Sequence, residues 1–211
     1  MKKNILNLSA IVVILGSLAF TGCKKPDKTA PVITLNGAAS LTISLQGTYT
    51  ELGATANDDK DGAITPTLSG TVNVNHTGSY IITYRATDAT GNIATATRTV
   101  TIVNDVAAMA GPYSCSGSTT YNDTITSSSV KNNRIHFGKF GNYQGNTNIY
   151  VDIAGTTVVL DSVFAVQVGS PAFDRSFKGN GLISSPTVFN LDYTETTNGV
   201  TTNKSEIFTK Q

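Results

Sequence analysis

Two patterns of apolar residues divide the chain. Residues 5–20 form an apolar run that only a few small or polar residues interrupt. From Pro31 onward, apolar and polar residues alternate over short stretches that end in Gly, Asn or Asp. Such alternation is typical of strands with one buried face, and the residues between the stretches are typical of turns. The pattern therefore predicts an all-β protein behind an N-terminal apolar leader.

In the first half, the alternation predicts short strands with the spacing of a two-sheet sandwich. The expected strands are 32–35, 41–45, 53–56, 67–74, 78–87 and 92–103. One face of the 78–87 strand carries Tyr80, Ile82, Tyr84 and Ala86. We expect this face in the core, where the Tyr80 hydroxyl needs a hydrogen-bond partner. Asp88 is expected to accept hydrogen bonds from the amides of the turn that follows.

In the second half, turns such as Ala154-Gly155 and Asn198-Gly199 join successive strands as hairpins. This order favours an antiparallel meander, and closure into a barrel would remove its exposed edges. The expected strands are 113–119, 121–128, 134–140, 148–153, 156–160, 162–168, 172–184, 187–196 and 200–209. A small barrel either holds a ligand or is filled by its own side chains. We expect a filled interior, with a ligand cavity as the alternative, because aromatic residues are numerous: Phe137, Phe140, Tyr150, Phe164, Phe173, Phe177, Phe189, Tyr193 and Phe208.

The leader has the plan of a secretory signal peptide, because Lys2 and Lys3 precede the apolar run. The run is shorter than the stretch of about 20 apolar residues that spans a membrane, which leaves a spanning helix as the alternative. The segment 18–23, with Gly22 directly before Cys23, resembles a bacterial lipobox, although Phe20 stands where Leu is common. The resemblance implies cleavage between Gly22 and Cys23 and acylation of Cys23 by palmitate-like chains, which would anchor the protein to a membrane.

Charge and cysteine content narrow the class of protein further. The 211 residues carry a formal net charge of +1, and the leader holds two lysines and no acid, so the remaining chain is nearly neutral. Without a basic stripe, nucleic acid is not an expected partner. Cys115 is the one cysteine besides Cys23, and we expect a buried thiol, with an intermolecular disulfide as the alternative.

These features predict five segments along the chain. They are a signal peptide (1–22), a lipidated cysteine with a polar linker (23–30), an Ig-like β-sandwich (31–104), a hinge with one helical turn (105–111) and an antiparallel meander or barrel (112–211).

Several motifs of the first half occur in the order found in a known family. They are the segments 31–37, 49–56, 61–62, 78–80 and 88–92. Together they resemble a bacterial surface Ig-like domain, of the type named after a pesticidal crystal protein. The resemblance implies a β-sandwich that acts as a spacer, stalk or adhesion unit and has no common catalytic site.

The second half resembles a lipocalin-like carboxy-terminal module found in secreted bacterial lipoproteins of unknown function. The similarity lies in the segments 111–114, 135–140, 177–181 and 189–193. It implies a small β-barrel.

Two local patterns are candidate sites. The segment 57–62 resembles the start of an EF-hand loop, but Leu68 stands where the bidentate acid belongs. We expect a solvated acidic turn; calcium binding by Asp58, Asp59, Asp61 and Asp88 is the alternative, and no other cofactor is expected. Thr124 and Ser162 lie in triplets that resemble a bacterial O-glycosylation signal, for which ordinary strand residues are the simpler interpretation.

We expect a non-enzymatic lipoprotein in the envelope of a Gram-negative bacterium, anchored in the outer membrane. In this interpretation the Ig-like module presents the C-terminal module, which binds a glycan or an envelope protein. A purely structural stalk is the alternative. A glycan-acting hydrolase is the third interpretation, and its acids would come from Asp152, Asp161, Asp174, Asp192 and Glu195.

Overall fold

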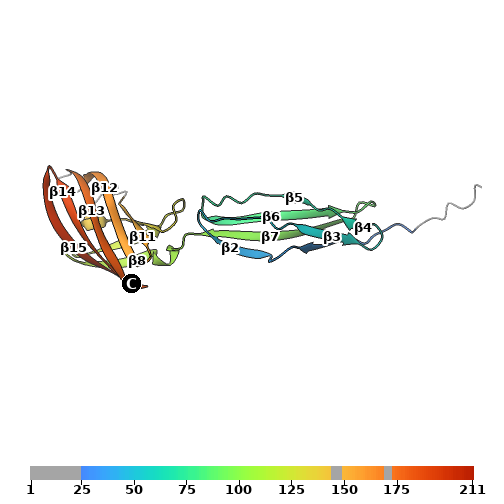
Figure 1. Cartoon of the computed structure of the whole chain (residues 1–211), viewed down its shortest axis with the longest axis horizontal. Helices are drawn as coiled ribbons and strands as arrows, with labels where there is room; N and C mark the ends of the chain where they lie inside the picture. Colours follow the sequence, from blue (N-terminus) through green and yellow to red (C-terminus); the bar gives the residue numbers. More distant parts are fainter. Residues whose placement is uncertain (1–24, 144–148, 169–172) are drawn as a thin grey trace, which may run out of the picture.

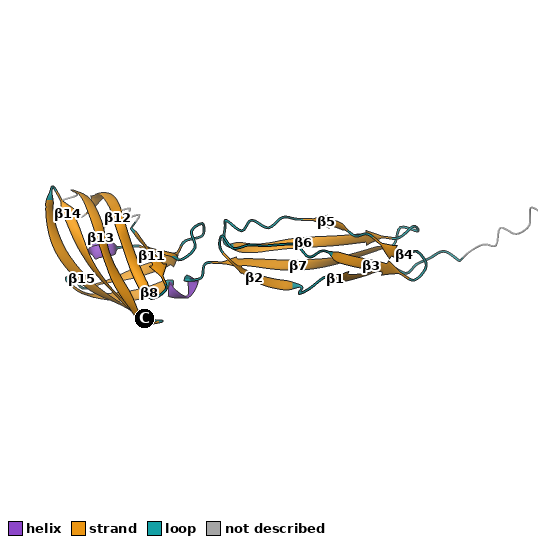
Figure 2. Cartoon of the chain, in the orientation of Figure 1, coloured by secondary structure: helices purple, strands orange, loops and turns teal. Residues whose placement is uncertain are grey.

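The computed structural model describes residues 25–143, 149–168 and 173–211, without the side chains of Ser162 and of residues 164–168. The molecule is elongated, with a two-sheet module and a barrel arranged end to end (Figure 1). Apart from two single 3₁₀ turns, the regular structure of the described residues consists of strands (Figure 2). Within these residues no helix has the length and apolar character needed to cross a membrane.

The first module is a sandwich of two sheets, as predicted. One sheet has the antiparallel order β1 (Val32–Leu35), β3 (Ala54–Asp58), β4 (Gly62–Ile64). The other has the order β2 (Ser40–Ser44), β7 (Ile93–Val103), β6 (Gly78–Thr87), β5 (Thr67–Ser69). In this second sheet β2 runs parallel to β7, while the other pairs are antiparallel.

The predicted strand 67–74 was too long. β5 ends at Ser69, because Gly70 adopts a φ of +95° and its Cα lies so close to β6 that a Cβ would meet the Ile81 carbonyl oxygen at 2.3 Å. Val72 and Val74 still pack against the core from outside any strand. In the segment after β5, the alternation of apolar residues therefore reflects side-chain packing against the core and not pairing within a sheet. The short β4 was missed by the prediction.

The predicted core face of β6 is confirmed. Ile82, Tyr84 and Ala86 are buried, and the Tyr80 hydroxyl donates a hydrogen bond of 2.9 Å to the His76 carbonyl. Asp88 Oδ1 accepts hydrogen bonds from the amides of Thr90 at 2.9 Å and Asn92 at 2.7 Å, as expected of the turn.

A charged side chain lies in the centre of this sandwich. Arg98 is fully buried and donates a hydrogen bond of 2.7 Å to the Asn36 carbonyl. Its Nη1 lies 3.2 Å from Glu51 Oε1, an ion pair without hydrogen-bond geometry. Glu51 in turn accepts hydrogen bonds from the hydroxyls of Tyr49 and Tyr84. The network joins residues of both sheets, because Arg98 and Tyr84 belong to one sheet and Asn36 directly follows β1 of the other.

The second module is a closed antiparallel barrel, so the predicted closure is confirmed. Its strands follow one another in space as in sequence, and β15 returns to pair with β8. They are β8 (Gly111–Gly117), β9 (Tyr121–Ser127), β10 (Arg134–Phe137), β11 (Tyr150–Ala154), β12 (Thr157–Val168), β13 (Phe173–Ser185), β14 (Val188–Thr197) and β15 (Val200–Lys210). The prediction of two strands over 156–168 was wrong, since a register shift between Leu160 and Val163 lets one strand continue.

Aromatic rings fill the barrel. Phe140 reaches the centre from the 3₁₀ turn η2 (Phe140–Asn142), and its ring centroid lies 4.8 Å from that of Tyr193 and 5.3 Å from that of Phe177. Six of the predicted core rings are buried: Phe137, Phe140, Phe177, Phe189, Tyr193 and Phe208. Tyr113 and Tyr121 join them, although the prediction omitted both. Phe173 is only half-buried, and the side chain of Phe164 lies outside the described residues.

The prediction for Tyr150 was wrong. Its neighbour Val151 points into the barrel and is fully buried, so the alternation of the strand turns Tyr150 to the outer face. There the Arg134 guanidinium lies 3.6 Å from the ring centroid.

The two modules meet through a buried amide. Asn104 directly follows β7, and its Nδ2 donates hydrogen bonds of 2.9 Å and 3.0 Å to the carbonyls of Ser128 and Lys131 in the barrel. Its Oδ1 accepts from the Asn133 amide at 3.0 Å. The predicted helical turn is present as η1 (Ala107–Met109), and Met109 is buried in the barrel core. The connection between the modules is therefore short, and the hydrogen bonds of Asn104 and the burial of Met109 fix it to the barrel.

Candidate functional site

A polar hollow of about 430 Å³ lies on the outer surface of the barrel, across β13, β14 and β15. The register of the strands explains its lining. Lys178 pairs with Thr194, and Thr194 with Asn203, which places these three side chains in one row. Asn180 and Asp192 lie in the adjacent outward row. Between the rows, Gly179 and the buried Tyr193 also line the hollow.

Glycine lets β13 lie unusually close to β14 beneath the hollow. A Cβ on Gly179 would meet the Asp192 carbonyl oxygen at 2.1 Å, and a Cβ on Gly181 would meet that of Asn190 at 1.7 Å. Close approach of a second backbone is a recognised reason for glycine within a strand. We expect any larger residue at either position to push the two strands apart and change the shape of the hollow.

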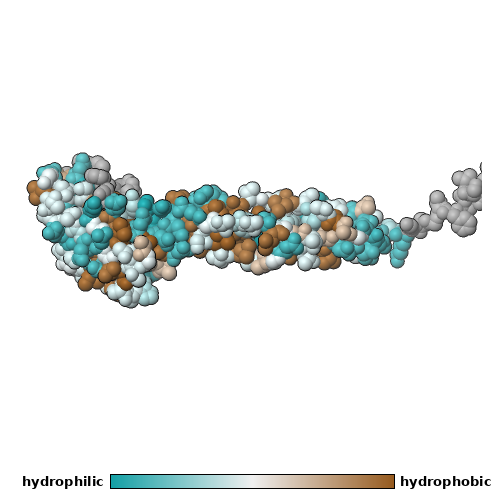
Figure 3. All heavy atoms as spheres, in the orientation of Figure 1, coloured by the Kyte–Doolittle hydropathy of each residue, from teal (hydrophilic) through white to brown (hydrophobic). Residues whose placement is uncertain are grey.

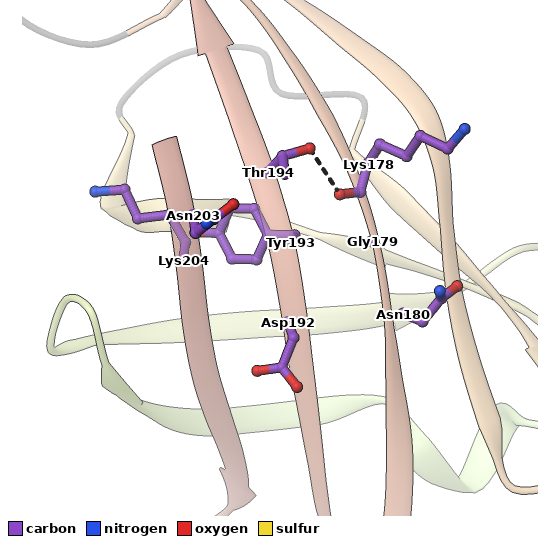
Figure 4. Close-up of a pocket in the computed structure, with 8 residues that line it drawn as sticks. All are labelled: Lys178, Gly179, Asn180, Asp192, Tyr193, Thr194, Asn203 and Lys204. Atoms are coloured by element: carbon purple, nitrogen blue, oxygen red, sulfur yellow. Dashed lines mark hydrogen bonds between the residues drawn. The ribbon is translucent and has the colours of Figure 1, made fainter. Parts of the chain in front are cut away.

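The hollow offers both hydrogen-bond donors and acceptors. Figure 4 shows the Thr194 hydroxyl donating to the Lys178 carbonyl, a bond of 3.2 Å, with the Lys178 ammonium and the Asp192 carboxylate at separate places on the wall. The Asp192 carboxylate accepts hydrogen bonds from Ser205 at 2.5 Å and Asn190 at 3.4 Å, which hold its position. Such a mixture of ammonium, amide, carboxylate and hydroxyl groups suits a ligand rich in hydroxyls.

Behind the hollow, the interior of the barrel contains a buried carboxylate. The Tyr193 hydroxyl donates to Glu206 Oε1 at 3.2 Å, and the Thr119 hydroxyl donates to the same oxygen at 2.7 Å. Glu206 is fully buried, and its Oε2 has no hydrogen-bond partner among the residues that the structure describes. Burial, together with the charge of Glu206, raises the pKa of Tyr193 above its ordinary value.

A second buried carboxylate lies further along β14. Glu195 accepts hydrogen bonds of 2.7 Å and 2.8 Å from the Tyr143 hydroxyl and forms an ion pair with Arg175. Burial, followed by the hydrogen bond to Glu195, raises the pKa of Tyr143. Glu195, one of the candidate hydrolase acids, is thus buried in the barrel and is 5% exposed.

The outer face of β10 and β11 carries an aromatic cluster of a different kind. Arg134 forms two hydrogen bonds with Asp152, at 2.6 Å and 2.7 Å, while its guanidinium covers the Tyr150 ring. The His136 ring centroid lies 5.9 Å from that of Tyr150, and burial lowers the pKa of His136. Because Arg134 occupies one face of Tyr150, that face is closed to a stacking ligand.

The four candidate calcium ligands, joined by Asp27, form two groups that share Asp58. One group holds Asp58, Asp61 and Asp88, the other Asp27, Asp58 and Asp59, and in each group one carboxylate oxygen per residue lies within 4.8 Å of the others. The expectation of a solvated turn is wrong for Asp58, which is 3% exposed, and Asp88 of the neighbouring turn is 6% exposed. The EF-hand analogy also ends here, since Leu68 lies exposed on β5.

The remaining predicted site residues are placed as follows. Thr124 is exposed on the outer face of β9, while the Ser162 side chain, Gly22 and Cys23 lie outside the described residues. Cys115 is 1% exposed, which confirms the buried thiol, and burial raises its pKa to about 12.

The sandwich matches a known family. Residues 33–102 match the family described as bacterial surface protein, Ig-like domain. The sandwich is therefore similar to a bacterial-surface Ig-like domain. The match covers the strands from β1 to β7 and leaves the barrel outside it.

Three solved structures are similar over 85% of this chain. The lipoprotein BT2262 from Bacteroides thetaiotaomicron is 17% identical, is covered over its full length and gives a TM-score of 0.35. A structure of the CBM51-2 and INT domains from Clostridium perfringens ZmpB, in complex with GlcNAc, is 13% identical and is covered over 43%, with a TM-score of 0.29.

The third structure holds the M60 catalytic domain of the same ZmpB with its CBM51-1 and CBM51-2 domains. It is 13% identical and is covered over 21%, with a TM-score of 0.30. No curated protein sequence matches the chain. Similarity at this level assigns no ligand to the barrel.

Proposed function

We propose that the protein is a lipid-anchored envelope protein whose Ig-like domain holds the barrel away from the membrane so that the barrel binds a glycan. The polar hollow on β13, β14 and β15 is the observation that carries this proposal. The barrel lies at the opposite end of the molecule from residue 25, where the described chain begins (Figure 1). A ligand would therefore bind at the hollow, far from the anchored end of the protein.

In this proposal the chain is cleaved before Cys23, acylated there, and linked to the Ig-like domain by the tether up to residue 30. Two or three acyl chains hold a protein firmly, since each buried CH₂ contributes about 0.8 kcal/mol. The bacterial-surface Ig-like domain supports a location in the cell envelope. We place the anchor in the outer membrane of a Gram-negative cell.

The junction supports the role of the Ig-like domain as a spacer. Besides the contacts of Asn104, the Thr77 amide donates to the Ser129 carbonyl at 2.8 Å, and the Asn132 amide donates to Gln46 Oε1 at 3.2 Å. These bonds join the loops of the Ig-like domain to the loop between β9 and β10. A connection fixed at several points transmits the orientation of the domain to the barrel.

The chemistry of the hollow favours binding over catalysis. Sugar hydroxyls both donate and accept hydrogen bonds, and Asn180, Asn203 and Asp192 supply both kinds of partner. Glycoside hydrolysis generally uses a pair of carboxylates. Among the residues that line this hollow, Asp192 is the single acid.

A glycan-array screen of residues 24–211 tests the proposal, with Asp192→Asn and Asn180→Ala as variants. We expect saturable binding of at least one glycan and a loss of about tenfold in affinity for each variant, as the removal of one good hydrogen bond predicts. Asp161→Asn is the matched control, because this acid is exposed on β12 outside the hollow.

Two outcomes would contradict the proposal. Full affinity in both hollow variants would place the glycan elsewhere on the molecule. If the folded protein binds no glycan on the array, the interpretation as a purely structural stalk takes precedence, and an envelope pull-down would then test for a protein partner.

A further inference from the structure

We propose that Asp58, Asp61 and Asp88 form a calcium site at the end of the Ig-like domain that receives the tether. The three residues come from two turns that are distant in sequence. Asp58 ends β3 and Asp61 lies in the turn to β4, whereas Asp88 begins the turn between β6 and β7. Hydrophilic residues gather at this end of the domain (Figure 3).

The two turns are already in contact. Asp61 Oδ2 accepts a hydrogen bond of 2.6 Å from the Ala89 amide, which lies next to Asp88. One carboxylate oxygen from each of the three acids lies within 4.8 Å of the other two. Three carboxylates at this separation repel one another, and partial burial strengthens the repulsion. A cation between them would remove it.

The buried carboxylate of Asp58 provides an independent indication of a cation site. Its Oδ1 accepts hydrogen bonds from the amides of Lys60 at 2.9 Å and Asp61 at 3.0 Å. Its Oδ2 is buried and has no hydrogen-bond partner among the described residues, although the residue is only 3% exposed. A buried carboxylate oxygen without a partner is strongly unfavourable. Oδ2 is thus the oxygen that Asp58 has free for a cation.

The donor set favours calcium. The group contains only carboxylates, which are hard oxygen ligands, and includes no histidine or cysteine. Calcium accepts six to eight oxygens in flexible geometry, and carboxylates bind it through one or both oxygens. Because Asp61 is exposed, water can complete the shell. An EF-hand loop would have an acid at the position of Leu68. In the proposed site, Asp88 supplies a carboxylate from another turn instead.

The neighbouring acids are less suited to the same role. Asp27 Oδ1 lies 2.7 Å from the Lys60 ammonium, so its charge is already balanced within the group of Asp27, Asp58 and Asp59. The same ion pair fastens the tether to the turn of Asp58, and Asn92 Nδ2 donates to the Thr29 carbonyl at 3.0 Å. Calcium would therefore stiffen the two turns on which the tether is held.

The test is calorimetric titration of calcium into residues 24–211 after removal of metal with EDTA, together with thermal unfolding. We expect one saturable site and a melting temperature that rises with calcium concentration. Asp58→Asn and Asp61→Asn are each expected to weaken binding at least tenfold. Asp61 is exposed, so its variant keeps the test valid if Asp58→Asn does not fold.

Asp59→Asn is the matched control, since Asp59 belongs only to the other group. The proposal would be overturned if the unaltered protein showed no heat of binding and no thermal shift with calcium. Unchanged affinity in Asp61→Asn, or a loss in Asp59→Asn equal to that in Asp61→Asn, would also overturn it. The result is independent of the glycan screen, because the acids belong to the Ig-like domain and the hollow to the barrel.

Discussion

The Ig-like domain and the barrel are both built of strands, but different forces hold their interiors. The central cluster of the Ig-like domain is small and aliphatic, around Leu45, Val100 and Ile102. Beside it lies the buried Arg98 with its partner Glu51. The barrel has a large cluster in which aromatic rings contact one another, with Phe140 at the centre. Its buried carboxylate Glu206 has hydroxyl partners and no ion pair among the described residues.

The difference shows how shape determines the kind of core. Two packed sheets with few large apolar side chains form a small apolar core, and a polar network connects the sheets beside it. A closed barrel encloses a volume that must be filled from all sides, and large rings fill it with few residues. We therefore expect the barrel to depend on packing and the Ig-like domain to depend on charge.

Phe140→Ala should have the largest effect. Phe140 is fully buried against Phe177 and Tyr193, and removal of such a ring costs about 3–5 kcal/mol because it leaves a cavity. Calorimetric unfolding should show the barrel transition moving to lower temperature while the Ig-like transition stays. Leu182→Ala is the control, since Leu182 is 57% exposed on β13 and should change little. Equal shifts of both transitions would mean that the modules unfold as one unit.

Glu51→Gln should have the next largest effect, about 3 kcal/mol on the Ig-like transition, because it leaves the Arg98 charge buried without its counterion. Glu206→Gln is the matched variant in the barrel. It removes a buried charge that has no cationic partner among the described residues, so we expect no loss of stability or a gain. Urea unfolding followed for each transition measures both. A large loss in Glu206→Gln would contradict the contrast between the modules.

Acidification should produce the smallest effect, with opposite signs in the two modules. In the folded Ig-like domain, the pKa values of Glu51 and Asp88 lie below their ordinary values. Desolvation raises each pKa, but hydrogen bonds to the carboxylates outweigh it. The donors are Tyr49 and Tyr84 for Glu51, and Asn92 for Asp88. The two ionised carboxylates therefore stabilise the folded domain fully above the unfolded pKa of about 4, and this contribution is lost as the pH falls through the folded pKa.

Burial instead raises the pKa of Asp123 in the barrel, despite hydrogen bonds from the amides of Thr124 and Lys139. Its charged form is disfavoured in the folded state, so protonation below the raised pKa adds stability. Calorimetry between about pH 6 and pH 3 should show the Ig-like transition falling relative to the barrel. Asp123→Asn should abolish the contribution of this group, and a barrel that loses stability first would contradict the assignment.

The sequence showed several of the candidate site residues individually, but it did not show which of them lie together. Asp58, Asp61 and Asp88 were named from turn patterns, but their proximity depends on two turns meeting at one end of the sandwich. Glu206 gave no signal, because alternation marks a strand face without saying which residues lie across the barrel from it. The hollow was equally hidden, since Lys178, Asp192 and Asn203 come together only through the registers of three strands.

The sequence by itself determined the class of fold, the sandwich in the first half and the order of the hairpins. These follow from local periodicity and from turn residues such as Asn198 and Gly199, which adopt φ values of +51° and +77°. Only the tertiary structure decided that Tyr150 faces outward, that β12 is one strand, and that Glu195 and Glu206 lie inside. Alternation defines two faces of a strand, and sheet pairing and closure determine which face becomes the interior.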